Sequence, residues 1–354
     1  MTKLRGHSIL FVVNSLEGGG AENSIRHLTR KLVSNGVPVF LCALNKSEFD
    51  SIENRYSHEY VLNRKWEDGI IKTLRSIQEF RTLILELKPE IIIANCELPE
   101  LFVALSSPLK SGIIGVEHTS NPWDGRQILG TVVRLILKIR RANWVTVSSN
   151  QQKIWNGSNF PQYIANPINA DDISHVSNYP RKVVFIGRLR PEKRPEWAIA
   201  SALEAGLSIE LFGDGASRVE LEAEYANHSE NVTFHGYIEK PWREISKDSI
   251  VILPSVYEGD GMVAAEAIIR GQKILLADNL DLRRFNLPDE NYFKTLGELT
   301  SKLMLWDKDE GNVFGIPEEV SSDMRIRRDI EIVVEHWKLL LNHQSKLANG
   351  ERRK

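Results

Sequence analysis

Short apolar runs alternate with amphipathic stretches along most of this 354-residue chain. Runs rich in Val, Ile and Leu are typical of strands buried on both faces of a parallel sheet. The runs expected to form strands are 8–14, 37–44, 91–95, 113–117 and 144–148 in the first half, and 182–187, 208–212, 232–235, 250–253 and 273–277 in the second. The stretches between them show the helical period. Two series of strand–helix units predict an α/β chain of two doubly wound, Rossmann-like domains with parallel sheets.

A segment rich in Pro, Asn and Asp, at 166–180, separates the two series. We therefore predict one domain over residues 1–169 and a second over 170–321. The chain is long enough for two hydrophobic cores. A long amphipathic pattern at about 322–346 predicts a final helix, and the basic residues 349–354 predict a disordered tail.

The composition is that of a soluble globular protein: 42% hydrophobic residues, 26% charged residues and a net charge of −2. No apolar run approaches the roughly 18 residues that a membrane-spanning helix needs. The N-terminus imitates a signal peptide, but its apolar core is only Ile9–Val13, so a first strand is the better interpretation. Cys42 and Cys96 lie in apolar segments, which predicts reduced, buried thiols in a cytosolic protein.

Positive charge gathers in the first half of the chain. Residues 1–169 carry 20 Lys and Arg against 15 Asp and Glu, whereas the rest of the chain carries 25 against 32. The stretch 132–141 places Arg134, Lys138 and Arg141 among aliphatic residues. Two interpretations stay open: a domain helix with a solvated face, or a helix that rests on an anionic membrane surface.

The segment 254–266 carries the most chemistry, with the sequence Pro-Ser-Val-Tyr-Glu-Gly-Asp-Gly-Met-Val-Ala-Ala-Glu. Glu258 and Glu266 stand on either side of a glycine turn that opens a helix. The first residues of that helix are Gly261, Met262 and Val263. Such a helix directs its free N–H groups and the positive end of its dipole toward an anion. Two carboxylates beside an anion site suit a ligand that carries hydroxyls at both ends of a diphosphate.

Two cations follow the first strand of the second half. That strand ends in Gly187-Arg188, and Lys193 comes five residues later. Ligands of open α/β domains bind at the carboxyl edge of the sheet, where both cations are expected. Arg188 can bind two phosphate oxygens as a fork, and Lys193 can act as a point charge. On spacing alone, two solvated surface cations are the commoner outcome.

The first half offers a glycine run and one histidine. Gly18, Gly19 and Gly20 lie between a strand and a helix, where backbone can approach a phosphate or sugar closely. The dinucleotide fingerprint fails because Asn23 replaces its last glycine, which argues against a nicotinamide oxidoreductase. His118 ends a strand before an irregular loop, a common place for functional residues, although a lone His is more often structural.

Other literal matches carry less weight. Asp307-Lys-Asp309 fits the Asp-x-Asp pattern of metal-dependent transferases, but it lies at a helix end near the C-terminus rather than after a central strand. The chain has no Cys/His set with zinc spacing. Nothing beyond scattered basic residues suggests a nucleic-acid partner.

These motifs, in this order, resemble the retaining glycosyltransferases of family 4. The shared pattern is Gly-Gly-Ala-Glu after the first strand, a later His, Gly-Arg-Leu followed by Lys, and two Glu separated by seven residues. The resemblance covers the chain from Ser8 to about Ala277. It implies the GT-B fold, in which two Rossmann-like domains enclose an interdomain cleft and a terminal helix packs back on the first domain.

The resemblance implies roles for individual residues. Arg188 and Lys193 would clamp the donor diphosphate and count among the catalytic residues. His118 would also be catalytic, because it would orient the donor sugar and the acceptor. Gly19 and Gly20 would border the donor phosphates or the acceptor.

The remaining donor-binding roles fall on the second half. Glu258, also catalytic, would hold hydroxyls of the donor sugar, and Glu266 would hold those of the ribose. Tyr237 and Ile238 would adjoin the nucleotide base. The amides that would receive the diphosphate belong to Gly261, Met262 and Val263.

The reaction implied is transfer of a sugar, with retention, from a nucleoside diphosphate sugar, most simply a UDP-sugar. The acceptor would be a saccharide or an undecaprenyl-diphosphate-linked saccharide in bacterial surface polysaccharide synthesis, at the cytosolic face of the inner membrane. Neither a metal nor another cofactor is expected. The alternative is a nucleotide-sugar-binding partner protein that lacks turnover, and a donor-hydrolysis assay separates the two.

Asp260 departs from the family pattern, which usually has an aromatic or aliphatic residue between the two glycines. A carboxylate near a diphosphate is repulsive unless it meets a sugar hydroxyl, an amino sugar or a neighbouring cation. The residue is therefore a hint about specificity. After Ala277 the usual glycine-rich turn is also missing, so the far side of the donor pocket is expected to differ.

Overall fold

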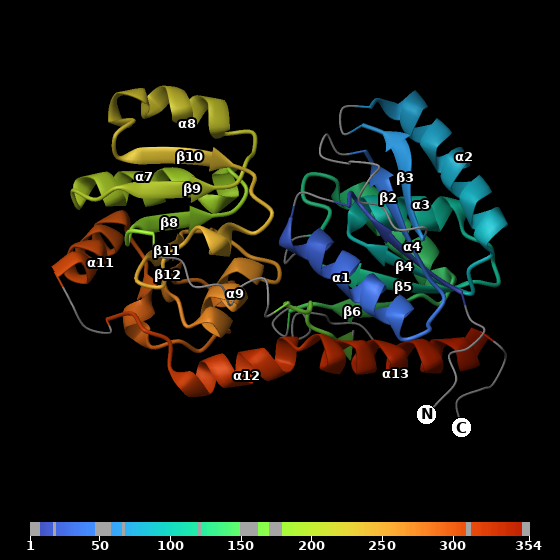
Figure 1. The fold of residues 1–354 in the computed structure, drawn as a ribbon. Helices are drawn as coiled ribbons and strands as arrows, with labels where there is room; N and C mark the ends of the chain where they lie inside the picture. Colours follow the sequence, from blue (N-terminus) through green and yellow to red (C-terminus); the bar gives the residue numbers. More distant parts are fainter. Residues whose placement is uncertain are drawn as a thin grey trace. The chain divides into compact units, whose positions relative to one another are not determined.

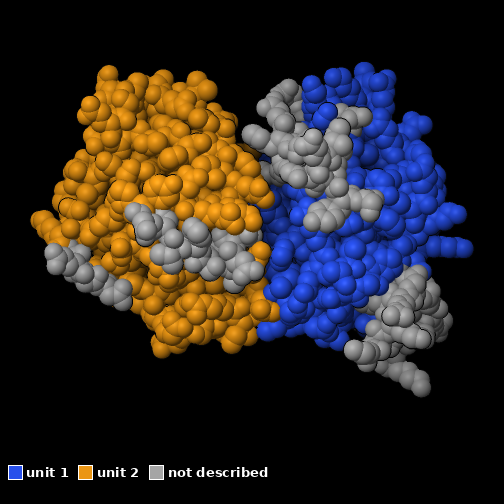
Figure 2. Space-filling view, in the orientation of Figure 1, with its two compact units in different colours: residues 1–167, 330–354 blue, residues 168–329 orange. Residues whose placement is uncertain are grey.

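The computed structural model of the protein describes residues 8–16, 19–46, 58–65, 68–118, 122–148, 162–169, 179–308 and 313–348. The chain forms two compact units (Figure 2). Unit 1 comprises residues 1–167 and 330–354, and unit 2 comprises residues 168–329. Most of the predicted joint, residues 170–178, lies outside the described residues, as does the basic tail.

The described part of unit 1 contains a parallel sheet with the strand order β3-β2-β1-β4-β5-β6-β7 (Figure 1). Its strands are β1 Ile9–Val13, β2 Val39–Asn45, β3 Glu59–Arg64, β4 Ile91–Asn95, β5 Gly112–Glu117, β6 Asn143–Thr146 and β7 Gln162–Tyr163. The order reverses between β1 and β4, so the carboxyl ends of these neighbours form a topological switch point.

Helices cover both faces of this sheet, as its apolar strands require. They are α1 Gly20–Ser34, α2 Ile70–Leu87, α3 Glu97–Ser106, α4 Gln127–Ile139 and α13 Ile330–Ala348. One face packs against α1 and α13, where Phe11 and Trp337 lie 5.5 Å apart between ring centroids. The other face packs against α2, α3 and α4, where Phe80 and Phe102 meet edge to face. Alternate residues of β1 point into the two cores.

The single helix predicted at about 322–346 is wrong. The chain forms two helices there, α12 Glu318–Arg328 in unit 2 and α13 in unit 1. They are separated at Asp329, whose φ of −60° and ψ of 132° are extended. Asp has a low helix propensity, and its two neighbouring helices bury their apolar stripes in different units. In unit 1, α13 places Val333, Val334 and Leu341 in the core.

The described part of unit 2 contains a second parallel sheet with the order β10-β9-β8-β11-β12-β13. Its strands are β8 Val183–Ile186, β9 Ile209–Phe212, β10 Val232–Gly236, β11 Ile250–Leu253, β12 Lys273–Ala277 and β13 Tyr292–Phe293. Its helices include α7 Pro195–Glu204, α8 Arg218–Glu224, α9 Met262–Arg270, α10 Leu280–Arg283, α11 Leu296–Lys308 and α12. The switch point of this sheet lies between β8 and β11.

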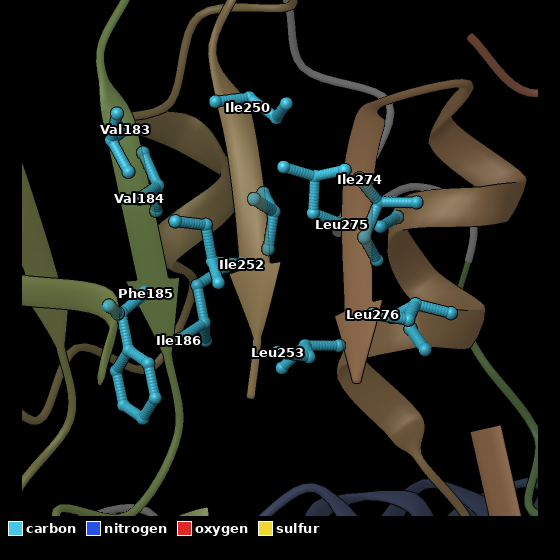
Figure 3. Close-up of a cluster of buried hydrophobic side chains, with 14 of the residues drawn as sticks. Val183, Val184, Phe185, Ile186, Ile250, Ile252, Leu253, Ile274, Leu275 and Leu276 are labelled. Atoms are coloured by element: carbon cyan, nitrogen blue, oxygen red, sulfur yellow. The ribbon is translucent and has the colours of Figure 1, made fainter. Parts of the chain in front are cut away.

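The core of unit 2 comes from the apolar runs that predict its strands. Side chains of β8, β11 and β12 fill the space beside one another (Figure 3). Val183, Ile250 and Leu275 are fully buried. The loops at the carboxyl ends of β8 and β11 carry Arg188, Lys193 and Glu258 of the predicted site.

Among the strands that the structure describes, β3, β7 and β13 were not predicted. β3 has a short apolar run, Tyr60–Leu62, that packs against the two cores, but polar residues flank it, and Glu59 at its start pairs with Arg26 and Arg30 of α1. β7 and β13 have two residues each, which is too short to show a period.

Candidate active site

Glu258 and Lys193 meet at the switch point of unit 2. The Lys193 Nζ lies 2.6 Å from Glu258 Oε1, and the Ser255 hydroxyl donates to the same oxygen at 2.7 Å. The backbone N–H of Glu258 donates to Asp281 Oδ2 at 3.0 Å. The carboxylate is therefore held in one orientation by a cation, a hydroxyl and the fixed path of its own backbone. Both residues were predicted site residues, and the structure brings them together.

The loops that carry this pair are bonded to each other through their backbones. Lys193 ends the short 3₁₀ helix η2 (Pro191–Lys193), which follows β8, and Glu258 follows β11. The N–H of Val256 donates to the Glu192 carbonyl at 2.8 Å. Because β8 and β11 are neighbours in the sheet, the ammonium–carboxylate contact follows from the topology.

Arg188 lies exposed at the carboxyl end of β8, where glycines allow three strand ends to approach closely. The Gly213 N–H donates to the Gly236 carbonyl at 2.7 Å. A Cβ on Gly213 would lie only 1.9 Å from the carbonyl oxygen of Gly187, so a side chain there is excluded. This packing places the guanidinium-bearing segment at the edge where the cations were expected.

The turn before α9 is built on a left-handed glycine. Gly261 has a φ of 57° and directly precedes Met262, the first residue of the helix, followed by Val263. The Arg284 Nη1 donates to the Gly259 carbonyl at 2.8 Å. The N-terminus of α9 therefore opens at the same sheet edge as Glu258, with no acidic residue in its first turn.

Asp260 meets a neighbouring cation, one of the three partners expected for it. Its carboxylate binds both terminal nitrogens of Arg328, at 2.6 Å for Oδ2 and 2.7 Å for Oδ1. Both side chains are almost fully buried, at 4% and 3% exposure. Arg284 contributes a second guanidinium 3.9 Å from Oδ1. The acid is thus compensated within unit 2.

Glu266 sits about one turn into α9 and accepts a hydrogen bond from Trp242 Nε1 at 2.8 Å. Trp242 is itself buried, in the short 3₁₀ helix η4 (Pro241–Arg243). Tyr237 and Ile238 are half-buried and follow β10 in the loop that leads to this tryptophan. The contact therefore joins the segment predicted to adjoin a base to the carboxylate predicted to bind a ribose.

The predicted residues of unit 1 lie around its own switch point. Gly19 is the N-cap of α1, directly after it Gly20 is exposed, and Gly18 lies outside the described residues. The His118 Nε2 lies 3.2 Å from Asn95 Oδ1. The side-chain amide nitrogen of Asn95 donates to the Val12 carbonyl at 3.0 Å. Its oxygen is therefore the acceptor toward His118, and His118 Nε2 is the donor.

Comparison with known proteins agrees with the resemblance on which the roles rest. Residues 18–171 match the family Glycosyltransferase Family 4, and residues 169–292 match the family Glycosyl transferases group 1. The two matches together span both sheets. The chain belongs to glycosyltransferase family 4.

This glycosyltransferase is similar to a curated bacterial enzyme of Campylobacter jejuni subsp. jejuni serotype O:2. That protein is GalNAc-alpha-(1->4)-GalNAc-alpha-(1->3)-diNAcBac-PP-undecaprenol alpha-1,4-N-acetyl-D-galactosaminyltransferase. The two are 24% identical over 297 residues, which cover 77% of this chain and 83% of the relative.

Solved structures confirm the fold of the glycosyltransferase. Anabaena HepE, in complex with UDP and glucose, aligns with a TM-score of 0.78 at 17% identity, over 94% of this chain and 99% of that one. Sucrose-phosphate synthase from Thermosynechococcus elongatus aligns with a TM-score of 0.77 at 16% identity, over 95% and 98%. The two helix-covered parallel sheets are those of the predicted GT-B fold.

Arg134 does not lie on the solvated face where the glycosyltransferase sequence suggested it. Its guanidinium pairs with the buried carboxylates of Glu100 and Glu117 and stacks 4.9 Å over the Trp144 ring. The prediction of three exposed basic residues is therefore wrong for Arg134. The helical period of a sequence indicates which face of the helix a residue occupies. It does not reveal partners from other elements, and the two acids that attract this arginine come from α3 and β5.

The solvent-exposed face of α4 is apolar instead. Its side chains, Ile128, Leu129, Val132, Leu135 and Ile139, are between 42% and 86% exposed. Lys138 and Arg141 are exposed beside them, and so are Leu109 and Lys110 before β5. We call these residues the α4 surface. The glycosyltransferase thus carries an exposed aliphatic stripe with cations at its margin.

Several residues of the site could not be found from the sequence motifs. Arg328 comes from α12, far along the chain, and Trp242 and Asp281 come from the short helices η4 and α10, which no sequence motif marks. Asn95 is the exception, because a polar residue at the end of a buried strand is itself a signal. A residue that acts through a partner can be recognised only once the position of that partner is known.

Among the described residues, no three His, Cys, Asp or Glu side chains lie close enough together to hold a metal ion. Asp309 of the discounted Asp-x-Asp pair lies outside those residues. None of the helices described is both long enough and apolar enough to cross a bilayer.

Proposed function

We propose that this glycosyltransferase moves a sugar from a UDP-sugar to a lipid-linked saccharide, with retention at the anomeric carbon. The observation that carries the proposal is the Lys193–Glu258 pair, which lies beside the N-terminus of α9 at the switch point of unit 2. An ammonium, an oriented carboxylate and free helix amides are the groups that a sugar diphosphate requires.

The leaving diphosphate is stabilised electrostatically. Arg188, Lys193 and the amides of Met262 and Val263 face the charge that develops as the bond from sugar carbon to phosphate oxygen breaks. The acceptor hydroxyl forms its bond on the same face of the sugar, and its proton passes to the departing phosphate oxygen. No metal is assigned to the reaction, because these groups supply the positive charge. Chelation with EDTA is expected to leave turnover unchanged.

The sugar and nucleoside ends of the donor are held separately. Glu258, oriented by Lys193 and Ser255, accepts hydrogen bonds from hydroxyls of the donor sugar. Glu266 accepts hydrogen bonds from the ribose hydroxyls and is oriented by Trp242, while Tyr237 and Ile238 lie against the base. Each carboxylate thus has one task, and neighbouring groups fix its direction: Lys193 and Ser255 for Glu258, and Trp242 for Glu266.

In unit 1 we assign to His118 the orientation of the acceptor hydroxyl, because Asn95 fixes its ring. Gly19 and Gly20 bring the start of α1 close to the acceptor or to the donor phosphates. The Campylobacter relative acts on an undecaprenol diphosphate saccharide, which supports an acceptor of that class and a place in bacterial surface polysaccharide synthesis. Such an acceptor is reached from the cytosolic face of the inner membrane.

The α4 surface supports peripheral attachment of unit 1 to an anionic bilayer. Burying its aliphatic side chains in the interface removes apolar area from water, and Lys110, Lys138 and Arg141 attract acidic headgroups. The sequence predicts Arg134 among those cations, but its guanidinium pairs with Glu100 and Glu117 and does not contribute. The apolar stripe replaces it as the main contribution.

A donor screen tests the proposed function. Thermal unfolding is measured with UDP-, GDP-, ADP- and TDP-sugars, and only a true ligand raises the melting temperature by mass action. We expect a UDP-sugar to give the largest shift and to be hydrolysed slowly. A donor that binds but is neither hydrolysed nor transferred would support the partner protein without turnover. No shift with any donor would refute the assignment.

A further inference from the structure

Asp260 places a buried carboxylate at the helix end that is proposed to receive the donor diphosphate. The residue lies between Gly259 and Gly261, two positions after Glu258 and three before Val263. A negative charge that stabilises an isolated helix N-terminus also repels a second anion there. The position therefore requires a compensating cation if the helix end is to bind a diphosphate.

Arg328 provides that cation through a two-point contact. Its Nη1 and Nη2 bind the two carboxylate oxygens at 2.6 and 2.7 Å, and Nη2 also lies 3.3 Å from the Asp260 carbonyl oxygen. A planar guanidinium held at two oxygens fixes direction as well as charge. The contact therefore restrains both the side chain and the backbone of the turn.

Arg328 is also bonded at its own backbone. It is the last residue of α12, one position before the extended Asp329. Its carbonyl accepts the N–H of Ile168 at 3.0 Å. Residues 168 and 328 stand next to the two positions where the chain passes between the units. Arg328 thus links the turn before α9, through its side chain, to Ile168, through its backbone carbonyl.

We propose that Arg328 is a positioning residue for sugar transfer: it cancels the charge of Asp260 and holds the 259–261 turn so that the N-terminus of α9 accepts the donor diphosphate. The proposal rests on the donor site proposed above. It explains why this chain carries an acid where the family usually has an aromatic or aliphatic residue. Arg328 acts through Asp260 and is not itself assigned a contact with the donor.

The electrostatic part predicts a rescue that a purely structural role does not. In Arg328→Gln the buried Asp260 carboxylate loses its two-point partner and keeps only Arg284, 3.9 Å away, so it repels the diphosphate. UDP affinity, measured by calorimetry on the full chain, therefore falls on the order of tenfold. In the Arg328→Gln/Asp260→Asn double variant the repelling charge is gone, so most of the affinity returns. The donor KM should follow the same order, with a smaller change in kcat.

The positioning part is measured without nucleotide. Hydrogen exchange of the amides at 259–266 should be faster in Arg328→Gln than in the wild type. Arg327→Gln is the matched control, since Arg327 lies on the same helix but pairs with Asp323 at the surface, and it should change neither exchange nor affinity. Arg328→Lys keeps the charge and loses the fork, so it serves if the Gln variant does not fold and should lose less affinity.

The outcomes are distinct. Unchanged exchange at 259–266 in Arg328→Gln and Arg328→Lys overturns the proposal whether or not UDP binds. A double variant as weak as the single one overturns the charge compensation. If the wild type binds neither UDP nor another nucleoside diphosphate, the proposed function fails, and the exchange data still decide whether Arg328 holds the turn.

Discussion

Lys193 and Glu258 lie 65 positions apart in the chain, yet their side chains meet at 2.6 Å. Each was predicted for its place after a strand, and the parallel sheet brings the two strand ends together. The pair is only partly exposed, at 23% for Lys193 and 11% for Glu258, so the contact is stronger than a solvated surface ion pair. A diphosphate that arrives there would share an ammonium that the protein has already positioned.

Arg188→Ala should reduce turnover by about 100- to 1,000-fold, the loss typical of removing one group that stabilises a developing oxyanion. The melting temperature should stay within a few degrees because the side chain is exposed. Sugar transfer or donor hydrolysis measures the first, and thermal unfolding the second. Arg190→Ala, two residues further on and also exposed, is the control. Turnover close to normal in Arg188→Ala would remove the clamp from the mechanism.

The Glu100–Glu117 pair shares one guanidinium, that of Arg134, so one carboxylate of the two keeps its proton to a higher pH. Burial, with Glu100 and Glu97 nearby, raises the pKa of Glu117 from 4.5 to about 7, although Arg134 opposes this. The folded protein therefore binds this proton more tightly than the unfolded chain, and its stabilising effect is lost as pH rises from 4.5 through about 7.

Glu117→Gln should remove that dependence, because the amide does not titrate. Thermal unfolding of both proteins across the interval from pH 4.5 to about 7 measures it. The wild type should lose stability relative to the variant as pH rises. Parallel curves would show that the Glu117 carboxylate is ionised throughout the interval and that burial does not raise its pKa.

At the scale of the helix, α4 illustrates how an amphipathic pattern can be assigned to the wrong side. Arg134 and the exposed aliphatic residues occupy opposite faces of the helix, since Val133 and Leu137 beside the arginine are buried in the core. The sequence predicts Arg134, Lys138 and Arg141 on one face, either solvated or resting on an anionic membrane surface. The structure has an aliphatic face in solvent, and that difference changes which substitutions test membrane attachment.

Ile128→Ser/Ile139→Ser should lower binding to vesicles that contain phosphatidylglycerol by at least severalfold, because it removes apolar area that the bilayer would bury. The fold should be little affected, since both side chains are largely exposed. Lys138→Glu/Arg141→Glu should lower it further at low salt and little at high salt. Co-sedimentation with vesicles measures both. Leu339→Ser, an exposed leucine of α13 on the other face of the sheet, is the control. Equal binding by all variants would contradict attachment through α4.

At the scale of the whole molecule, the chain leaves unit 1, completes unit 2 and returns to unit 1 with α13. Unit 1 is therefore incomplete until the last helix has been made, and its core depends on residues from both ends of the chain. Trp337, 4% exposed, packs on Phe11 of the first strand. The complete core of unit 1 requires this long-range contact, whereas unit 2 is continuous in sequence.

Trp337→Ala should destabilise unit 1 by about 3–5 kcal/mol, the usual cost of truncating a buried large aromatic residue. Amide hydrogen exchange of β1 and β2 measures the loss, and amides of β8 and β11 in unit 2 report whether the effect stays within one unit. Leu339→Ala, on the same helix but exposed, should cost little. Unchanged exchange in β1 would mean that α13 does not complete the core.

Most strands of both sheets could be predicted because each is a dense apolar run with a local signal. The exceptions depend on distant partners. Glu59 at the start of β3 is neutralised by Arg26 and Arg30, and the break at Asp329 reflects helices that bury their apolar stripes in different units. The membership of the family and the fold were both predicted from motifs that follow strands, and both are confirmed. The roles of individual residues stay predictions.

The amino-acid sequence by itself determined the alternation of strands and helices, the glycine turns and the set of charged residues at strand ends, because these are properties of neighbours along the chain. Only the tertiary structure decided which charges compensate each other. Arg328 reaches Asp260, Arg134 turns inward to Glu117, and Trp242 bonds Glu266. A buried charge selects its partner by distance in space, and that distance exists only once the sheets and helices have packed.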